Sequence, residues 1–185
     1  MGKTLNDPLL LIGKIFAILA QAVMAIGGIA LALAIPALLI AQGPIAAELA
    51  KEAPHVDLPF PGMWIVAVMA IGLAILAMLF VFFGKLRQII GTVGEGDPFQ
   101  PANARRLSLM AWLMLGTQLT IIPAAAIGLQ IARYAEAFGD DVNDMSFSID
   151  GGFDFTGLLL VVILFILARV FRHGAAMRED LEGTV

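Results

Sequence analysis

The stretch Ile15–Ala41, IFAILAQAVMAIGGIALALAIPALLIA, contains no charged residue. A bilayer core about 30 Å thick is crossed by about 20 apolar residues in a helix. Because backbone N–H and C=O groups cannot stay unpaired in lipid, such a stretch must be helical there. The segment therefore predicts a transmembrane helix. It is about twice as long as the 7–15-residue core of a signal peptide, so we expect it to be retained.

Three later stretches have the same apolar character, over residues 63–84, 107–131 and 155–171. The last is uncharged only from Phe155 to Ala168, and Phe171 extends it. Clusters of Gly and Pro separate the stretches, as is typical of turns. The pattern predicts one integral-membrane domain over residues 1–185, an all-α four-helix bundle with both termini in the cytoplasm.

The composition excludes most soluble classes. Of 185 residues, 60% are hydrophobic and 14% are charged, whereas about 25% are charged in a typical globular domain. A cytosolic enzyme domain, a direct nucleic-acid binder and a disordered chain do not fit these values. The chain has no Cys, which removes disulfides, thiolate metal sites and cysteine nucleophiles.

The distribution of Lys and Arg predicts the orientation. Lys51 and Arg133 lie on one side of a four-span topology. The other nine basic residues lie on the opposite side, and they are Lys3, Lys14, Lys85, Arg87, Arg105, Arg106, Arg169, Arg172 and Arg178. The positive-inside rule makes this richer side cytoplasmic. We therefore expect a multi-pass protein of the cell inner membrane, with Trp64 and Tyr134 at the outer interface.

Small residues recur at spacings of three and four in three of the stretches, which predicts close helix contacts. The first set is Ala20, Val23, Gly27, Ala30, Ala34, Ala37 and Ala41. The second set is Ala67, Ala70, Ala74, Ala77, Val81 and Gly84, and the third is Gly116, Thr120, Ala124 and Gly128. We expect these sets to face the bundle interior, and the fourth helix to pack through large side chains. Gln118 and Thr120 are expected to be helix-packing polar residues, with Gln118 hydrogen-bonded across helices.

The sequence offers little that predicts chemistry. No ionisable residue lies in the middle of a span, although such a residue would indicate a functional site. His55 and His173 fall on opposite sides, and the acidic segment 139–144 does not match an EF-hand loop. We therefore expect no enzyme activity, no catalytic residue, no cofactor and no metal. Transport of an apolar substrate is left open.

Two cytoplasmic motifs are more distinctive. The first is G-D-P-F followed by N-x-R-R-L, over residues 96–107, and the second is V-F-x-x-G followed by M-R-E-D and a closing T-V, over residues 170–185. With Phe147-Ser148 and Asp150, these motifs make the chain similar to the bacterial membrane family called domain of unknown function 2975. Arg169 departs from the glutamate expected there.

This resemblance implies a four-helix inner-membrane protein whose gene commonly neighbours that of a small helix-turn-helix regulator. A regulator or sensor that binds this small cytosolic DNA-binding protein is the first interpretation. Its candidate partner surface consists of Asp97, Pro98, Phe99, Asn103, Arg105, Arg106, Phe171, Arg172 and Arg178. The alternatives are an accessory subunit that pairs with other membrane subunits, and a small bundle that binds membrane lipids or another hydrophobe.

Overall fold

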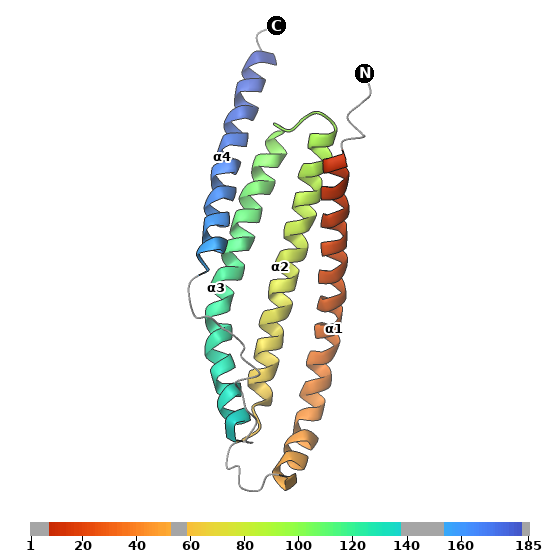
Figure 1. Ribbon diagram of the computed structural model, residues 1–185, viewed down its shortest axis with the longest axis vertical. Helices are drawn as coiled ribbons and strands as arrows, with labels where there is room; N and C mark the ends of the chain where they lie inside the picture. The colour runs from red at the N-terminus through yellow and green to blue at the C-terminus, as the bar shows by residue number, and fades with distance from the viewer. Residues whose placement is uncertain (1–7, 53–58, 138–153, 183–185) are drawn as a thin grey trace. The chain divides into compact units, whose positions relative to one another are not determined.

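The computed structural model describes residues 8–52, 59–137 and 154–182, and these form four α-helices (Figure 1). They are α1 (Pro8–Glu52), α2 (Gly62–Gly94), α3 (Pro101–Ala137) and α4 (Phe155–Glu182). All four are long and apolar enough to cross a membrane. The prediction of an all-α chain with four membrane-spanning helices is confirmed.

The helices extend well beyond the predicted spans. α1 has 45 residues and α3 has 37, because Lys and Arg are good helix formers and need not end a helix where the membrane ends. Gly91 and Arg133, which we expected in connections, lie inside α2 and α3. Those predicted boundaries are wrong, since a single glycine destabilises a helix interior by only about 1 kcal/mol.

Several predicted features lie outside the described residues. They are Lys3, the Asn6-Asp7 helix cap, Pro54, His55, the acidic segment 139–144, Phe147-Ser148, Asp150, the Gly151-Gly152 pair and the closing Thr184-Val185.

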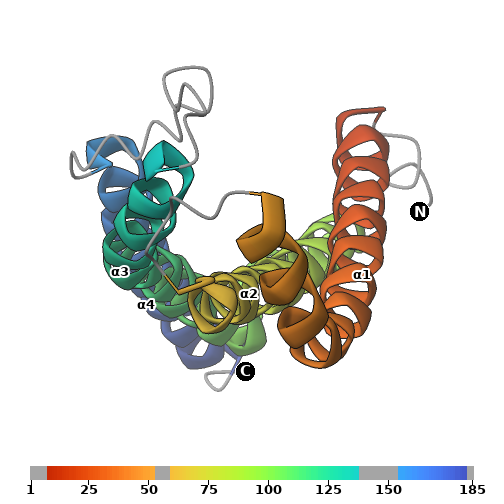
Figure 2. The same cartoon turned by 90° about the horizontal axis from the view of Figure 1, so that it is seen from below.

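The chain forms two compact units. Unit 1 contains residues 1–26, 77–118 and 154–185, and unit 2 contains residues 27–76 and 119–153. Each of α1, α2 and α3 therefore contributes to both units, whereas α4 belongs to unit 1 alone. In unit 1, α2 lies between α1 and α3, and α4 lies against α3 (Figure 1 and Figure 2).

Unit 1 has a core of large apolar side chains. Its buried members are Ile89 of α2, Leu107, Met110 and Ala111 of α3, and Leu164 and Ala168 of α4. On α4 the buried positions are Gly157, Val161, Leu164, Ala168 and Ala175, and their spacing of three, four or seven residues places them on one helix face. α4 thus packs through Val161 and Leu164, as expected, with small residues toward both ends.

Two of the three small-residue sets do not face the interior as expected. On α3 the whole set is partly buried, in agreement with the prediction. On α2, however, only Ala67 and Gly84 at the ends of the set are partly buried, and Ala70, Ala74, Ala77 and Val81 are exposed. Bulky residues such as Leu86 and Ile89 pack into the unit 1 core instead. The prediction is wrong for α2 because shape complementarity between large side chains, and not backbone approach alone, determines that contact.

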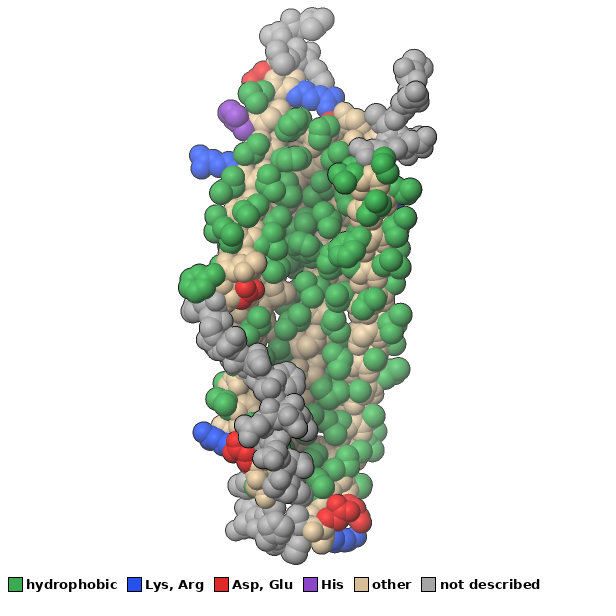
Figure 3. All heavy atoms as spheres, in the orientation of Figure 1, with side chains coloured by type: hydrophobic (Ala, Val, Ile, Leu, Met, Phe, Trp, Pro, Cys, Tyr) green, Lys and Arg blue, Asp and Glu red, His purple; other side chains and the backbone are tan. Residues whose placement is uncertain are grey.

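On α1 the small set divides into two halves. Val23, Ala30 and Ala37 are exposed, and the four others are partly buried at a spacing of seven residues. A helix that packs along one neighbour needs only such a narrow seam. Gly27, for example, lies against Leu76 of α2 in unit 2. Hydrophobic side chains cover much of the visible helix surface (Figure 3), which suits contact with lipid.

Candidate functional site

The connection between α2 and α3, residues 95–100, begins with a tightly hydrogen-bonded helix end. The Asp97 N–H donates to the Thr92 carbonyl at 3.0 Å, and the Gly96 N–H donates to the Val93 carbonyl at 3.0 Å. These two bonds form a Schellman motif, which requires a residue of positive φ between them. Gly96 provides it, with φ of 82°. The glycine in the first motif thus ends α2 and directs Asp97 and Phe99 away from the helix.

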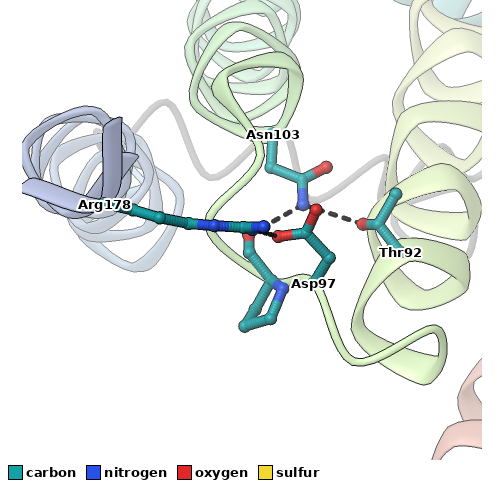
Figure 4. Close-up of polar contacts among 5 residues, drawn as sticks. Thr92, Asp97, Asn103 and Arg178 are labelled. Carbon is teal, nitrogen blue, oxygen red and sulfur yellow. Dashed lines mark hydrogen bonds and ion pairs between the residues drawn. The ribbon is translucent and has the colours of Figure 1, made fainter. Parts of the chain in front are cut away.

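Asn103 holds this connection in place. Its Nδ2 donates to Thr92 Oγ1 at 2.8 Å and to the Pro98 carbonyl at 2.9 Å (Figure 4). Its Oδ1 accepts from Arg106 Nη1 at 2.7 Å. Thr92 in turn donates to the Ile89 carbonyl at 2.8 Å. The Asn103 side chain is completely buried. Because an amide both donates and accepts hydrogen bonds, Asn103 joins α2, the connection and the start of α3. It therefore lies beneath the predicted partner surface and supports it.

The C-terminal part of α4 contacts the same connection. Arg178 forms an ion pair with Asp97 (Figure 4). The ring of Phe99 packs on that of Phe171, with centroids 5.4 Å apart. Phe99 also lies against Gly174, where an added Cβ would come within 2.6 Å of the ring. Two segments more than 70 residues apart in the sequence are thus joined by one ion pair and one apolar contact.

Most of the predicted surface residues are brought together. Asp97 contacts Arg178, and Phe99 contacts Phe171. Beneath them, Asn103 is hydrogen-bonded to Thr92, Pro98 and Arg106. Arg105 and Arg172 are exposed side chains on α3 and α4 of the same unit. Sequence reasoning missed Thr92 and Gly174 as parts of this cluster. Gly174 stands in the second motif, but Thr92 has no signal in the sequence.

A second polar contact joins α3 to the beginning of α4. Gln118 Nε2 donates to Asp154 Oδ2 at 2.9 Å, so its acceptor is a side chain at the residue that precedes α4. An added Cβ on Gly157 would overlap the Gln118 side chain, so a larger residue there would displace the Gln118 amide from Asp154. Thr120 is partly buried in unit 2.

Asp154 caps α4. The hydrogen bond from Gln118, followed by that from the Gly157 backbone N–H, lowers the pKa of the Asp154 carboxyl below its ordinary value. A carboxylate at this position accepts helix N–H groups and is favoured by the helix dipole. This capping role was not predicted from the sequence.

A family model described as protein of unknown function (DUF2975) matches residues 40–185. The chain belongs to this family. The match includes both motifs that form the cluster at the α2–α3 connection. Among curated proteins and solved structures, none matches the chain.

The cluster at the α2–α3 connection lies in a unit that is rich in Lys and Arg. The basic residues described in unit 1 are Lys14, Lys85, Arg87, Arg105, Arg106, Arg169, Arg172 and Arg178. The α2–α3 connection and the end of α4 lie at the same end of the unit as the start of α1 (Figure 1). Within residues 8–52, 59–137 and 154–182, no three His, Cys, Asp or Glu side chains are grouped to hold a metal ion.

Proposed function

We propose that this DUF2975 protein is a non-enzymatic regulator or sensor of the cell inner membrane that binds a small cytosolic protein. The binding surface, here called the docking face, consists of Asp97, Phe99, Arg105, Phe171, Arg172 and Arg178. The observation that supports it is the contact between the α2–α3 connection and α4, which joins the two distinctive motifs into one surface. The excess of basic residues in unit 1 supports a cytoplasmic position.

The chemistry of the docking face indicates the partner. Phe99 is 42% exposed and Met177 is 52% exposed, and Arg105 and Arg172 are exposed on α3 and α4 of the same unit. Arginine and aromatic side chains contribute strongly to protein interfaces. A complementary partner presents acidic residues around an apolar side chain. The family resemblance indicates a small helix-turn-helix DNA-binding regulator in this role.

The ion pair between Asp97 and Arg178 allows regulation. The Arg178 side chain is 50% exposed and the Asp97 side chain is 29% exposed, and ion pairs that solvent reaches contribute about 0–1 kcal/mol to stability. A carboxylate of the partner can therefore compete with Asp97 for Arg178 at little cost. Binding and release of the partner would then be coupled to the position of the connection relative to α4.

The test is co-purification in detergent of the full chain with a small helix-turn-helix regulator of the kind that the family resemblance implies as a gene neighbour. We expect recovery of the regulator to fall at least tenfold for Arg172→Glu, which reverses an exposed charge, and for Phe99→Ala. Truncation after Gly174 removes Arg178 and should have the same effect. Circular dichroism and gel filtration of each variant verify that the four helices remain.

Lys51→Glu is the matched control, because Lys51 is an exposed cation of unit 2 that pairs only with Glu48 three residues before it among the contacts of the described residues. It should leave recovery unchanged. Full recovery of the regulator with both Phe99→Ala and the truncated chain would contradict the proposal.

A further inference from the structure

Unit 2 contains a cavity of about 400 Å³ lined by three segments of the chain. Its walls come from α1 at Gln42, from the start of α2 with its preceding residues at Phe60 and Trp64, and from the last turns of α3 at Gln130, Arg133 and Tyr134. This volume lies within the range of ligand pockets in proteins. The docking face lies in unit 1, so neither the partner motifs nor their contacts account for this cavity.

The walls of the cavity are shaped by specific local packing. The rings of Phe60 and Tyr134 meet edge to face, with centroids 6.1 Å apart. Gly62 is buried beside them, and an added Cβ there would come within 2.7 Å of Gln42 Oε1. Glycine at the start of α2 therefore lets the Gln42 side chain lie against the helix end. The Gln42 amide nitrogen donates to the Leu39 carbonyl at 3.3 Å.

Among the described residues that line the cavity, Arg133 is the one with a charged side chain, and it is exposed on α3. The acids described in unit 2 are Glu48, Glu52 and Glu136, and none of them lines the cavity. A guanidinium group binds phosphate through two parallel N–H donors. The amides of Gln42 and Gln130 add donors suited to ester or hydroxyl oxygens.

The surroundings of the cavity are apolar. Met63 is 64% exposed and Trp64 is 49% exposed at the start of α2, and both line the cavity. Trp and Tyr beside a basic residue are typical of the membrane–water interface, where one end of a ligand is wet and the other is in hydrocarbon. A soluble anion would use Arg133 but would gain nothing from these helix surfaces.

We propose that the unit 2 cavity binds the phosphate-bearing headgroup of an anionic membrane lipid. Arg133 pairs with the phosphate, the two glutamines hydrogen-bond the glycerol and ester oxygens, and the rings of Phe60, Trp64 and Tyr134 pack against the upper part of the acyl chains. The site does not depend on the docking face or on any cytosolic partner.

The test uses Trp64 as a reporter in the full chain. The chain has two Trp residues, and Trp112→Phe leaves only Trp64 while keeping a ring against Phe165. In detergent, this protein is titrated with dioleoyl phosphatidylglycerol, with phosphatidylcholine of the same chains, and with glycerol 3-phosphate. We expect saturable Trp64 fluorescence changes with phosphatidylglycerol and at least tenfold weaker binding of phosphatidylcholine.

Arg133→Gln removes the charge from an exposed position, so the fold should persist, and the Kd for phosphatidylglycerol should rise at least tenfold. Lys51→Gln, which changes a cation outside the cavity, should leave that Kd unchanged. Equal binding of both lipids, or a Kd insensitive to Arg133→Gln, would overturn the proposal in favour of ordinary boundary lipid. Binding of glycerol 3-phosphate as tight as that of phosphatidylglycerol would also overturn it and indicate a soluble phosphate.

Discussion

Units 1 and 2 are built from the same three helices, but they pack differently. Among the described residues, every buried hydrophobic side chain of the core, from Ala17 to Ala175, lies in unit 1. In the part of unit 2 that the structure describes, the buried positions are only Pro61 and Gly62 at the start of α2. The difference follows from α4, which adds a fourth helix to unit 1 alone. Stability should therefore depend mainly on unit 1, whereas unit 2 contains the cavity beside Trp64.

The largest difference between the units should appear in Met110→Ala. Met110 is 2% exposed in the unit 1 core, and removal of a buried methionine side chain leaves a cavity that costs about 2–5 kcal/mol of unfolding free energy. Met63→Ala, at a position 64% exposed in unit 2, should change it by less than about 0.5 kcal/mol. Chemical unfolding in detergent measures both, and equal losses would contradict the comparison.

Asn103→Ala should give the next largest effect. It removes all three side-chain hydrogen bonds of a buried residue, and burial of the partners it leaves behind costs about 1–3 kcal/mol. Gln130→Ala in unit 2 is the control, since that side chain is exposed. Thermal unfolding in detergent distinguishes them. An unchanged melting temperature for Asn103→Ala would show that the α2–α3 connection holds without its amide.

Two glycine substitutions should have opposite signs. Gly174→Ala pushes a Cβ against Phe99 and should cost about 1 kcal/mol, because the partly exposed ring must move. In unit 2, Gly43 has no atom within 4 Å of an added Cβ, and Gly43→Ala should stabilise the helix by about 0.5–1 kcal/mol. Unfolding curves of the two variants test this. Gly91→Ala lies in equally open space in α2 of unit 1 and should also stabilise its helix. This variant tests whether the sign of the change in unfolding free energy follows the space around the added Cβ and not the unit.

The smallest effect is expected for the exposed ion pairs. Arg178→Gln and Lys51→Gln break one pair in each unit, and each should lower the unfolding free energy by less than about 1 kcal/mol. The effect should shrink further at 1 M salt, because the Debye length is then about 3 Å. A double-mutant cycle with Asp97→Asn measures the unit 1 pair. A coupling energy well above 1 kcal/mol would mean that the ion pair firmly holds the α2–α3 connection against α4.

Several features of the candidate site could be predicted from the sequence because they are local. Gly96 before Asp97 indicates a turn, and Pro8 marks the first residue of α1. The two motifs were recognised, and so was the hydrogen-bonding capacity of Gln118. Their partners were not: Thr92 and Gly174 contribute to the site only through residues that approach them in three dimensions.

The apolar stretches by themselves determined the number and type of the helices, because an uncharged run long enough to cross a bilayer leaves the backbone no alternative to helical hydrogen bonds. The sequence did not determine which helix faces meet. Small residues on α2 proved to be exposed and large ones buried, since lipid is as apolar as the protein interior and gives hydropathy no preference between them. Only the tertiary structure, through close packing of particular side chains, decided that α4 completes one unit and leaves the other with three helices.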